Sequence, residues 1–153
     1  MMTMMATSHM TAEAQSIMLL AREFARQYGQ QYIGTEHLLM AILGEPAGLG
    51  ARALESLSVD QDGVKAQIDL LLKARLHETW VMGRLPGTPH FRDILARARD
   101  RAKGTQNWQI GSEHLLLAIL EERNCTGCRV LEALGITLAT ARAAVARIRQ
   151  DRG

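Results

Sequence analysis

Apolar positions recur with the period of an α-helix along most of the chain, beginning just after Thr11. Thr11 is a favourable N-cap residue, and the pattern predicts a helix from there to about Tyr28. The apolar residues of this stretch share one helical face: Ile17, Leu20, Ala21 and Phe24. No stretch alternates with the two-residue period of a strand, which indicates an all-α protein.

Three more helices are predicted before residue 73. Gly34 interrupts the pattern, and we expect Thr35 to cap a second helix over 36–43. The turn residues "GEPAGLG" precede a short helix at about 50–57. Asp60 is expected to cap the fourth helix, whose apolar stripe consists of Val64, Ile68, Leu71 and Leu72.

The whole pattern then returns 77 positions later. "YIGTEHLLMAIL" at 32–43 recurs as "QIGSEHLLLAIL" at 109–120, with nine of twelve residues identical. Residues 11–76 align with 88–153 without a gap, so the repeat is a duplicated supersecondary unit. The second copy predicts helices near 89–103, 112–121, 127–134 and 138–150.

A duplicated four-helix unit predicts one all-α domain of eight helices, in which the repeats are related by a pseudo-twofold axis. Repeat 1 is expected to span 11–76 and repeat 2 to span 88–153, with a linker over 73–87. Residues 1–10 read as a disordered tail or an expression-tag remnant, because "SHM" at 8–10 resembles a cloning scar. In the linker, we expect the apolar residues to pack back on the domain: Trp80, Val81 and Met82.

Composition and charge exclude several classes of protein. The chain of 153 residues is 47% hydrophobic, and no apolar run reaches the roughly 18 residues that a membrane helix needs. Its start lacks the features of a secretory signal, so we expect a cytoplasmic protein without a membrane partner. The net charge is +2, although 88–153 carries 11 basic and 7 acidic side chains, against 7 and 9 in 1–87. We do not expect nucleic acid as the partner, but this asymmetry leaves it as an alternative.

The two copies of the motif carry a resemblance to a known family. "YIGTEHLL…IL" and "IGSEHLL…IL", each followed by a Gly-containing turn and a "LESL" or "LEAL" helix, resemble the Clp N-terminal domain. This double-repeat module is the N-terminal part of ClpA- and ClpC-type AAA+ unfoldases, and the motif sequence here is closer to that of the ClpC branch. The resemblance covers about 11–153 and implies an eight-helix domain that receives protein substrates, adaptors and small ligands. The ATPase of such proteins lies in other domains, and no G-x-x-x-x-G-K-[ST] occurs here. We therefore expect either part of an unfoldase or a stand-alone Clp-N protein.

The resemblance also implies binding residues. In ClpC-type domains, two pockets for phosphorylated arginine use the motif's Glu and the Thr that opens each repeat's first helix. The matching residues are Thr11 with Glu36, and Thr88 with Glu113. A carboxylate can pair with a guanidinium, and N–H groups at a helix N-terminus can receive a phosphate. The alternative is that each Glu only stabilises its own helix through the dipole, by about 0.3–1 kcal/mol.

The chain departs from the family where an aromatic usually precedes each of those Thr residues. Met10 and Gly87 stand there instead, which weakens the case for binding cyclic-peptide antibiotics at these positions. In the second copy, Thr88 is expected to cap the first helix with Pro89 at its first position, where a missing N–H costs nothing.

The remaining chemical groups suggest neither a metal, a cofactor nor catalysis. His37 and His114 lack the further ligands that zinc requires, so we expect histidines bonded to neighbouring backbone. Cys125 and Cys128 form a C-x-x-C without a preceding strand or a second ligand pair, and we expect incidental thiols. The Arg-rich stretch 92–103 is typical of a solvated helix face.

These observations predict a non-enzymatic recognition module of bacterial Clp-dependent proteolysis. Its expected partners are protein substrates or adaptors of Clp unfoldases and the Clp chaperone-protease subunits. The alternative is an accessory or scaffold protein that contacts the Clp ring and binds no client.

Overall fold

The computed structural model describes residues 10–29, 33–79, 88–104 and 109–152, and this part of the chain folds into eight helices. Their bounds are α2 (Ala12–Gln27), α3 (Thr35–Leu43), α4 (Leu49–Ser56), α5 (Gln61–Thr79), α6 (Thr88–Lys103), α7 (Ser112–Glu121), α8 (Thr126–Ala133) and α9 (Leu138–Arg152). Apart from the end of the fourth, every predicted helix begins and ends within about two residues of these bounds. The all-α prediction is confirmed.

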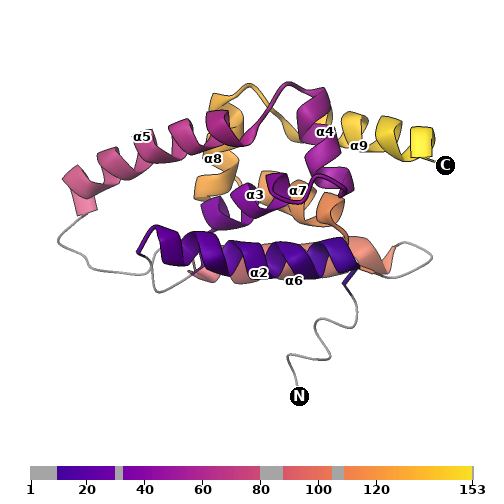
Figure 1. Ribbon diagram of the computed structural model, residues 1–153, viewed down its shortest axis with the longest axis horizontal. Coiled ribbons are helices and arrows are strands. Elements are labelled where there is room, and N and C mark those ends of the chain that lie inside the picture. The colour runs from indigo at the N-terminus through magenta and orange to yellow at the C-terminus, as the bar shows by residue number, and fades with distance from the viewer. Residues whose placement is uncertain (1–9, 30–32, 80–87, 105–108, 153) are drawn as a thin grey trace, which may run out of the picture.

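Helices α3 and α7 form the centre of the domain (Figure 1). In that view α2 and α6 lie on one side of this pair and α4 and α8 on the other, while α5 and α9 extend toward opposite ends. Every residue of α3 is buried, as is every residue of α7 from Ser112 to Leu120. Beyond their polar first turns, at 38–43 and 115–120, both helices are apolar on all sides, and such a segment is stable only inside a core, which explains the central place of the pair.

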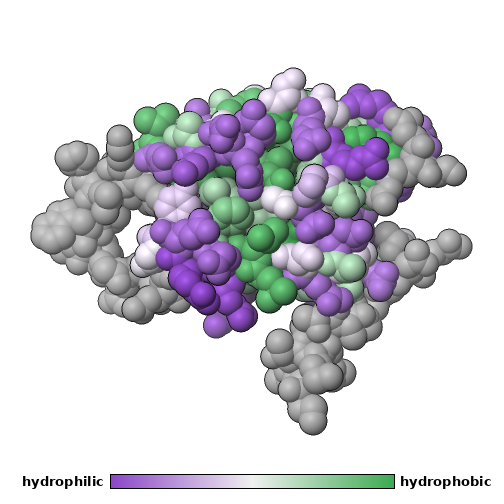
Figure 2. Space-filling model, in the orientation of Figure 1, coloured by the Kyte–Doolittle hydropathy of each residue, from purple (hydrophilic) through white to green (hydrophobic). Residues whose placement is uncertain are grey.

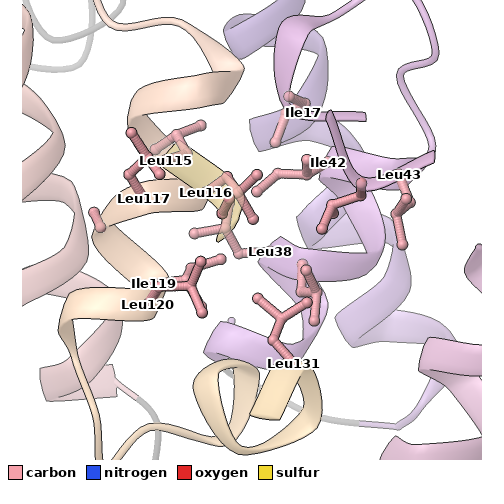
Figure 3. Close-up of a cluster of buried hydrophobic side chains, with 14 of the residues drawn as sticks. Ile17, Leu38, Ile42, Leu43, Leu115, Leu116, Leu117, Ile119, Leu120 and Leu131 are labelled. Carbon is pink, nitrogen blue, oxygen red and sulfur yellow. The ribbon is translucent and has the colours of Figure 1, made fainter. Parts of the chain in front are cut away.

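Side chains from both copies of the motif meet in one core. Figure 3 shows Leu38 and Ile42 of α3 together with Leu116 and Ile119 of α7 in the same cluster. Leu131 of α8 joins them. Two small units thus close a single core, which neither could build alone.

The third helices are exchanged between the repeats. Helix α4 of repeat 1 packs on α7 and α9 of repeat 2, whereas α8 of repeat 2 packs on α3 and α5 of repeat 1. The repeats are therefore interleaved as one domain rather than stacked as two.

A reciprocal pair of hydrogen bonds stabilises this exchange, and it corrects the predicted helix cap at Thr35. Thr35 and Ser112 do not cap their own helices, whose N-cap residues are the preceding glycines. Instead, Thr35 Oγ1 accepts the backbone N–H of Gly127 at 2.8 Å, and Ser112 Oγ accepts that of Gly50 at 2.8 Å. Because Gly50 and Gly127 lie in the first turns of α4 and α8, each repeat satisfies a free N–H of the other.

The same contact explains why a glycine recurs at 50 and 127. A Cβ on Gly50 would lie 2.9 Å from the carbonyl oxygen of Ser112, and one on Gly127 would lie 3.0 Å from that of Thr35. Any side chain there would push the two repeats apart.

Two segments differ from the prediction. The expected linker is helical from residue 73 to Thr79, because α5 continues through it, and Trp80, Val81 and Met82 lie outside the described residues. Met10, assigned above to the tail, is only 8% exposed and forms a parallel bridge with Ile110. Residues 1–9 lie outside the described part.

The surface is mostly polar. Figure 2 shows an apolar strip crossing the middle of the face on which α2 lies, between two polar regions. On α2 itself Leu19 is 67% exposed. Within the described residues, no helix has the length and hydropathy to cross a membrane.

Candidate functional site

The repeated Gly-x-Glu-His motif forms the start of each central helix. The backbone N–H of Gly34 donates to His37 Nδ1 at 2.9 Å, and Gly111 donates to His114 Nδ1 at the same distance. Burial lowers the pKa of both imidazoles, against the opposing effect of the adjacent glutamates. Each histidine is thus a neutral acceptor that closes its helix start, as the sequence predicted.

The two glutamates of the motif are buried beside the same glycines. Glu36 is 2% exposed and Glu113 is 9% exposed. Each carboxylate folds back over its N-cap residue: a Cβ on Gly34 would lie 2.4 Å from Glu36 Oε1, and one on Gly111 would lie 2.2 Å from Glu113 Oε1. Glycine at these positions therefore makes room for a carboxylate at a helix N-terminus, where negative charge is favoured.

The two carboxylates differ in their partners. Glu113 Oε2 accepts from Arg149 Nη2 of α9 at 2.8 Å. No ion pair formed within the described part of the chain involves Glu36. The motif is repeated, but its electrostatic surroundings are not.

Thr11 does not lie beside Glu36. It caps α2, where its Oγ1 accepts the N–H of Ala14 at 3.1 Å, and its own N–H donates to the carbonyl of Ile110 at 2.9 Å. Ile110 precedes Glu113 by three residues, so Thr11 lies near the start of α7.

The opposite end of α2 is the one that approaches Glu36. The ring of Tyr28 lies 5.7 Å from that of His37, and the negative charge of Glu36 is among the causes that raise the pKa of Tyr28, after burial and Asp69. A 16-residue helix is about 24 Å long, so Thr11 and Glu36 lie at opposite ends of α2. In the structure Thr11 therefore lies beside the motif of the other repeat, through its bond to Ile110. The side chain of Thr88 lies outside the described residues.

A groove accompanies each motif. The first-repeat groove has a volume of about 320 Å³ and is lined by Phe24, Gln27, Tyr28, Met40, Gln61, Asp62 and Lys65. The second-repeat groove has a volume of about 450 Å³ and is lined by Asp100, Arg101, Gly104, Glu113, His114, Leu117, Arg142, Val145, Ala146 and Arg149. Several residues that line the first-repeat groove have their equivalents, 77 positions later in the sequence, in the lining of the second-repeat groove. Only the second groove is lined by its own motif glutamate.

A third hollow, of about 560 Å³, lies away from both motifs and has Cys128 in its wall. Cys125 and Cys128 are buried free thiols, and Cys125 Sγ accepts the N–H of Cys128 at 3.3 Å as the N-cap of α8. Burial raises the pKa of both thiols, that of Cys128 to about 11. A thiolate is therefore disfavoured, and these cysteines are structural.

Sequence reasoning missed one cluster, formed by His90, Asp93 and Glu122. Their potential ligand atoms lie within 4.8 Å of one another, and His90 Nδ1 is 3.0 Å from Glu122 Oε2. The bond to His90 is the main cause that lowers the pKa of Glu122, and Arg97 also pairs with this carboxylate at 3.5 Å. Because the guanidinium of Arg97 already pairs with Glu122, the cluster is an ion-pair network that links α6 to the end of α7. The spacing of His90 and Asp93 on one helix face was the available signal.

Comparison with known proteins gives matches over most of the chain. The family model "Clp repeat (R) N-terminal domain" matches residues 9–80 and 87–151. The chain is 33% identical over 138 residues to an ATP-dependent Clp protease ATP-binding subunit ClpA homolog of Cyanidium caldarium, covering 90% of this chain and 16% of that protein. It is 31% identical over 138 residues to the chloroplastic chaperone protein ClpC2 of Oryza sativa subsp. japonica and to the chloroplastic ClpC of Pisum sativum, covering 90% of this chain and 15% of each relative. The chain thus spans about a sixth of the length of these relatives.

Proposed function

The chain belongs to the Clp N-terminal domain family, and from that premise we propose that it is a non-enzymatic recognition module of Clp-dependent proteolysis. Its ligands would be protein substrates or adaptors of a Clp unfoldase, and its place of action the cytoplasm. The relatives named above are algal and chloroplastic. A bacterial origin of this chain is therefore a proposal and does not come from those matches.

The observation that carries the proposal is the pair of buried carboxylates, Glu36 and Glu113, each held at the N-terminus of a central helix. A carboxylate removed from water forms a strong, bidentate pair with a guanidinium. Free N–H groups at helix starts suit a phosphate. Phosphorylated arginine carries both groups, so we propose degrons of this kind as the ligand.

The position of Thr11 changes the composition of each proposed pocket. Since Thr11 lies near the start of α7, we assign it to the pocket of Glu113. By the pseudo-twofold relation, Thr88 belongs with Glu36. Each pocket then draws on both repeats, which makes the interleaved fold a requirement for binding.

A titration of the protein with free phosphoarginine, followed by amide NMR, tests the proposal. The amides of Gly34 and Gly111 report on the two carboxylates separately, because each glycine lies under its own glutamate. We expect saturable shifts at these amides, and their loss in a Glu36→Gln/Glu113→Gln variant, which keeps side-chain volume and removes the charge. Glu23→Gln, on the exposed face of α2, is the matched control and should leave the shifts unchanged. Absence of shifts at millimolar ligand, or identical shifts in the double variant, would refute phosphoarginine binding.

The second candidate is a scaffold that contacts the Clp ring without binding clients. The first-repeat groove favours it, because Glu36 is not among the residues that line it, and a carboxylate that only supports its own helix needs no access to a groove. Under this reading, a pull-down with Clp subunits succeeds for the wild type and for the Glu36→Gln/Glu113→Gln variant alike.

A further inference from the structure

The second-repeat carboxylate already holds a guanidinium from its own chain. Arg149 Nη2 donates to Glu113 Oε2 at 2.8 Å, and the side chains are 53% and 12% exposed. The position that matches Arg149 in repeat 1 is Leu72, which carries no charge. The difference between the surroundings of the two motifs is therefore already present in the sequences of α5 and α9, the last helix of each repeat.

Arg149 contacts Glu113 as a bound ligand would, because its side chain is half-exposed and not part of the core. Arg149 of α9 lines the second-repeat groove, and because its side chain is half-exposed it can leave the carboxylate and return to water. Of the other arginines that line this groove, Arg101 pairs with Glu121, while no ion pair among the described residues involves Arg142. Arg149 alone places its guanidinium on Glu113 in the described structure.

We propose that Arg149 is an internal occupant of the repeat 2 site, so that a guanidinium ligand binds Glu113 only by displacing it. This inference rests on the proposed function and adds to it a residue that sets the affinity of one pocket. Among the described residues, no arginine or lysine pairs with Glu36. The two pockets of the pseudo-symmetric domain are then unequal.

The test uses the intact protein, free phosphoarginine and the amides of Gly34 and Gly111 as separate reporters. Arg149→Leu gives repeat 2 the residue found in repeat 1. We expect it to tighten binding reported by Gly111 about tenfold, which corresponds to ~1.4 kcal/mol, and to leave the affinity reported by Gly34 unchanged. Arg142→Leu removes the same charge from the same groove without freeing Glu113, and should not tighten binding. Arg149→Gln provides a second uncharged variant in case leucine destabilises the fold.

A ligand-free comparison tests the internal pair directly. Arg149→Leu should shift the Gly111 amide and spare Gly34, whereas Arg142→Leu should move neither. An unmoved Gly111 amide, or unchanged Gly111 affinity in both Arg149 variants while binding persists, would overturn the inference and leave the proposed function standing. Absence of phosphoarginine binding in every variant would refute both.

Discussion

Replacing Ser112 by alanine removes one of the two hydrogen bonds that link the repeats. Ser112 Oγ accepts the N–H of Gly50 at 2.8 Å, and both groups are buried. The N–H of Gly50 lies in the first turn of α4, so it has no acceptor within its own helix. In Ser112→Ala this donor would remain buried without its partner, because alanine offers no side-chain acceptor.

An unsatisfied buried N–H costs about 1–3 kcal/mol, and loss of a serine cap costs about 0.5–2 kcal/mol. We therefore expect Ser112→Ala to lower the free energy of unfolding by about 1–2 kcal/mol, where these ranges overlap. For a domain of this length, such a loss lowers Tm by roughly 2–8 °C. Thr35→Val, which removes the reciprocal acceptor of Gly127, should cost a similar amount.

Urea denaturation followed by far-UV circular dichroism measures both variants. Ser56→Ala is the matched control, since Ser56 Oγ donates to Ala53 O at 2.7 Å and accepts from Arg147 at 3.0 Å but lies exposed. Exposed substitutions of this kind change stability by about 0.5 kcal/mol or less. If Ser112→Ala costs no more than Ser56→Ala, the link between repeats does not contribute to stability as the structure indicates.

Two further predictions concern the buried titratable groups. Burial lowers the pKa of His37 and His114 in the folded protein below the ordinary histidine pKa of 6.5. Below pH 6.5 the unfolded chain therefore binds more protons than the folded chain. The free energy of unfolding should fall as the pH drops through this value, by up to about 1.4 kcal/mol per pH unit per histidine. Urea midpoints at pH 7.5 and 5.5 measure the effect, and an equal slope in a variant with asparagine at both positions would contradict it. Cys125 and Cys128 should react with a thiol reagent at pH 7.5 only as the protein unfolds, because both are buried with raised pKa values. Rapid labelling without urea would show that the start of α8 opens independently of the rest of the domain.

The helices could be predicted from the sequence because their signals are local. Apolar spacing, Thr11 and Asp60 located the starts of α2 and α5, and the side-chain bonds to Ala14 and Gly63 confirm both caps. The repeat itself predicted a single core, since two matching units must bury the same faces.

The errors arose where a residue acts across the repeats. Thr35 and Ser112 have the composition of helix caps, and they do cap helices, but those of the other repeat. Thr11 was assigned to Glu36 because both belong to one copy, whereas the fold brings it to Ile110 of the other. A local pattern holds no information on which copy a side chain reaches.

The difference between the two copies of the candidate site could not be predicted from the repeated motif alone. The Glu-His motif is identical in both copies, and only the fold shows that Arg149, far along the chain, reaches Glu113. Comparing α9 with α5 position by position would have shown Arg149 opposite Leu72, yet not that the arginine points at the motif.

Whether the two buried glutamates bind phosphoarginine is decided by calorimetric titration of the protein with the free ligand, with the Glu36→Gln/Glu113→Gln variant as reference. We expect saturable heat in the wild type, with a tighter and a weaker event, and none in the variant. Heat of equal size in both proteins would contradict it, because the buried carboxylates would then not be the binding groups, and no heat in either would leave them as helix-stabilising residues.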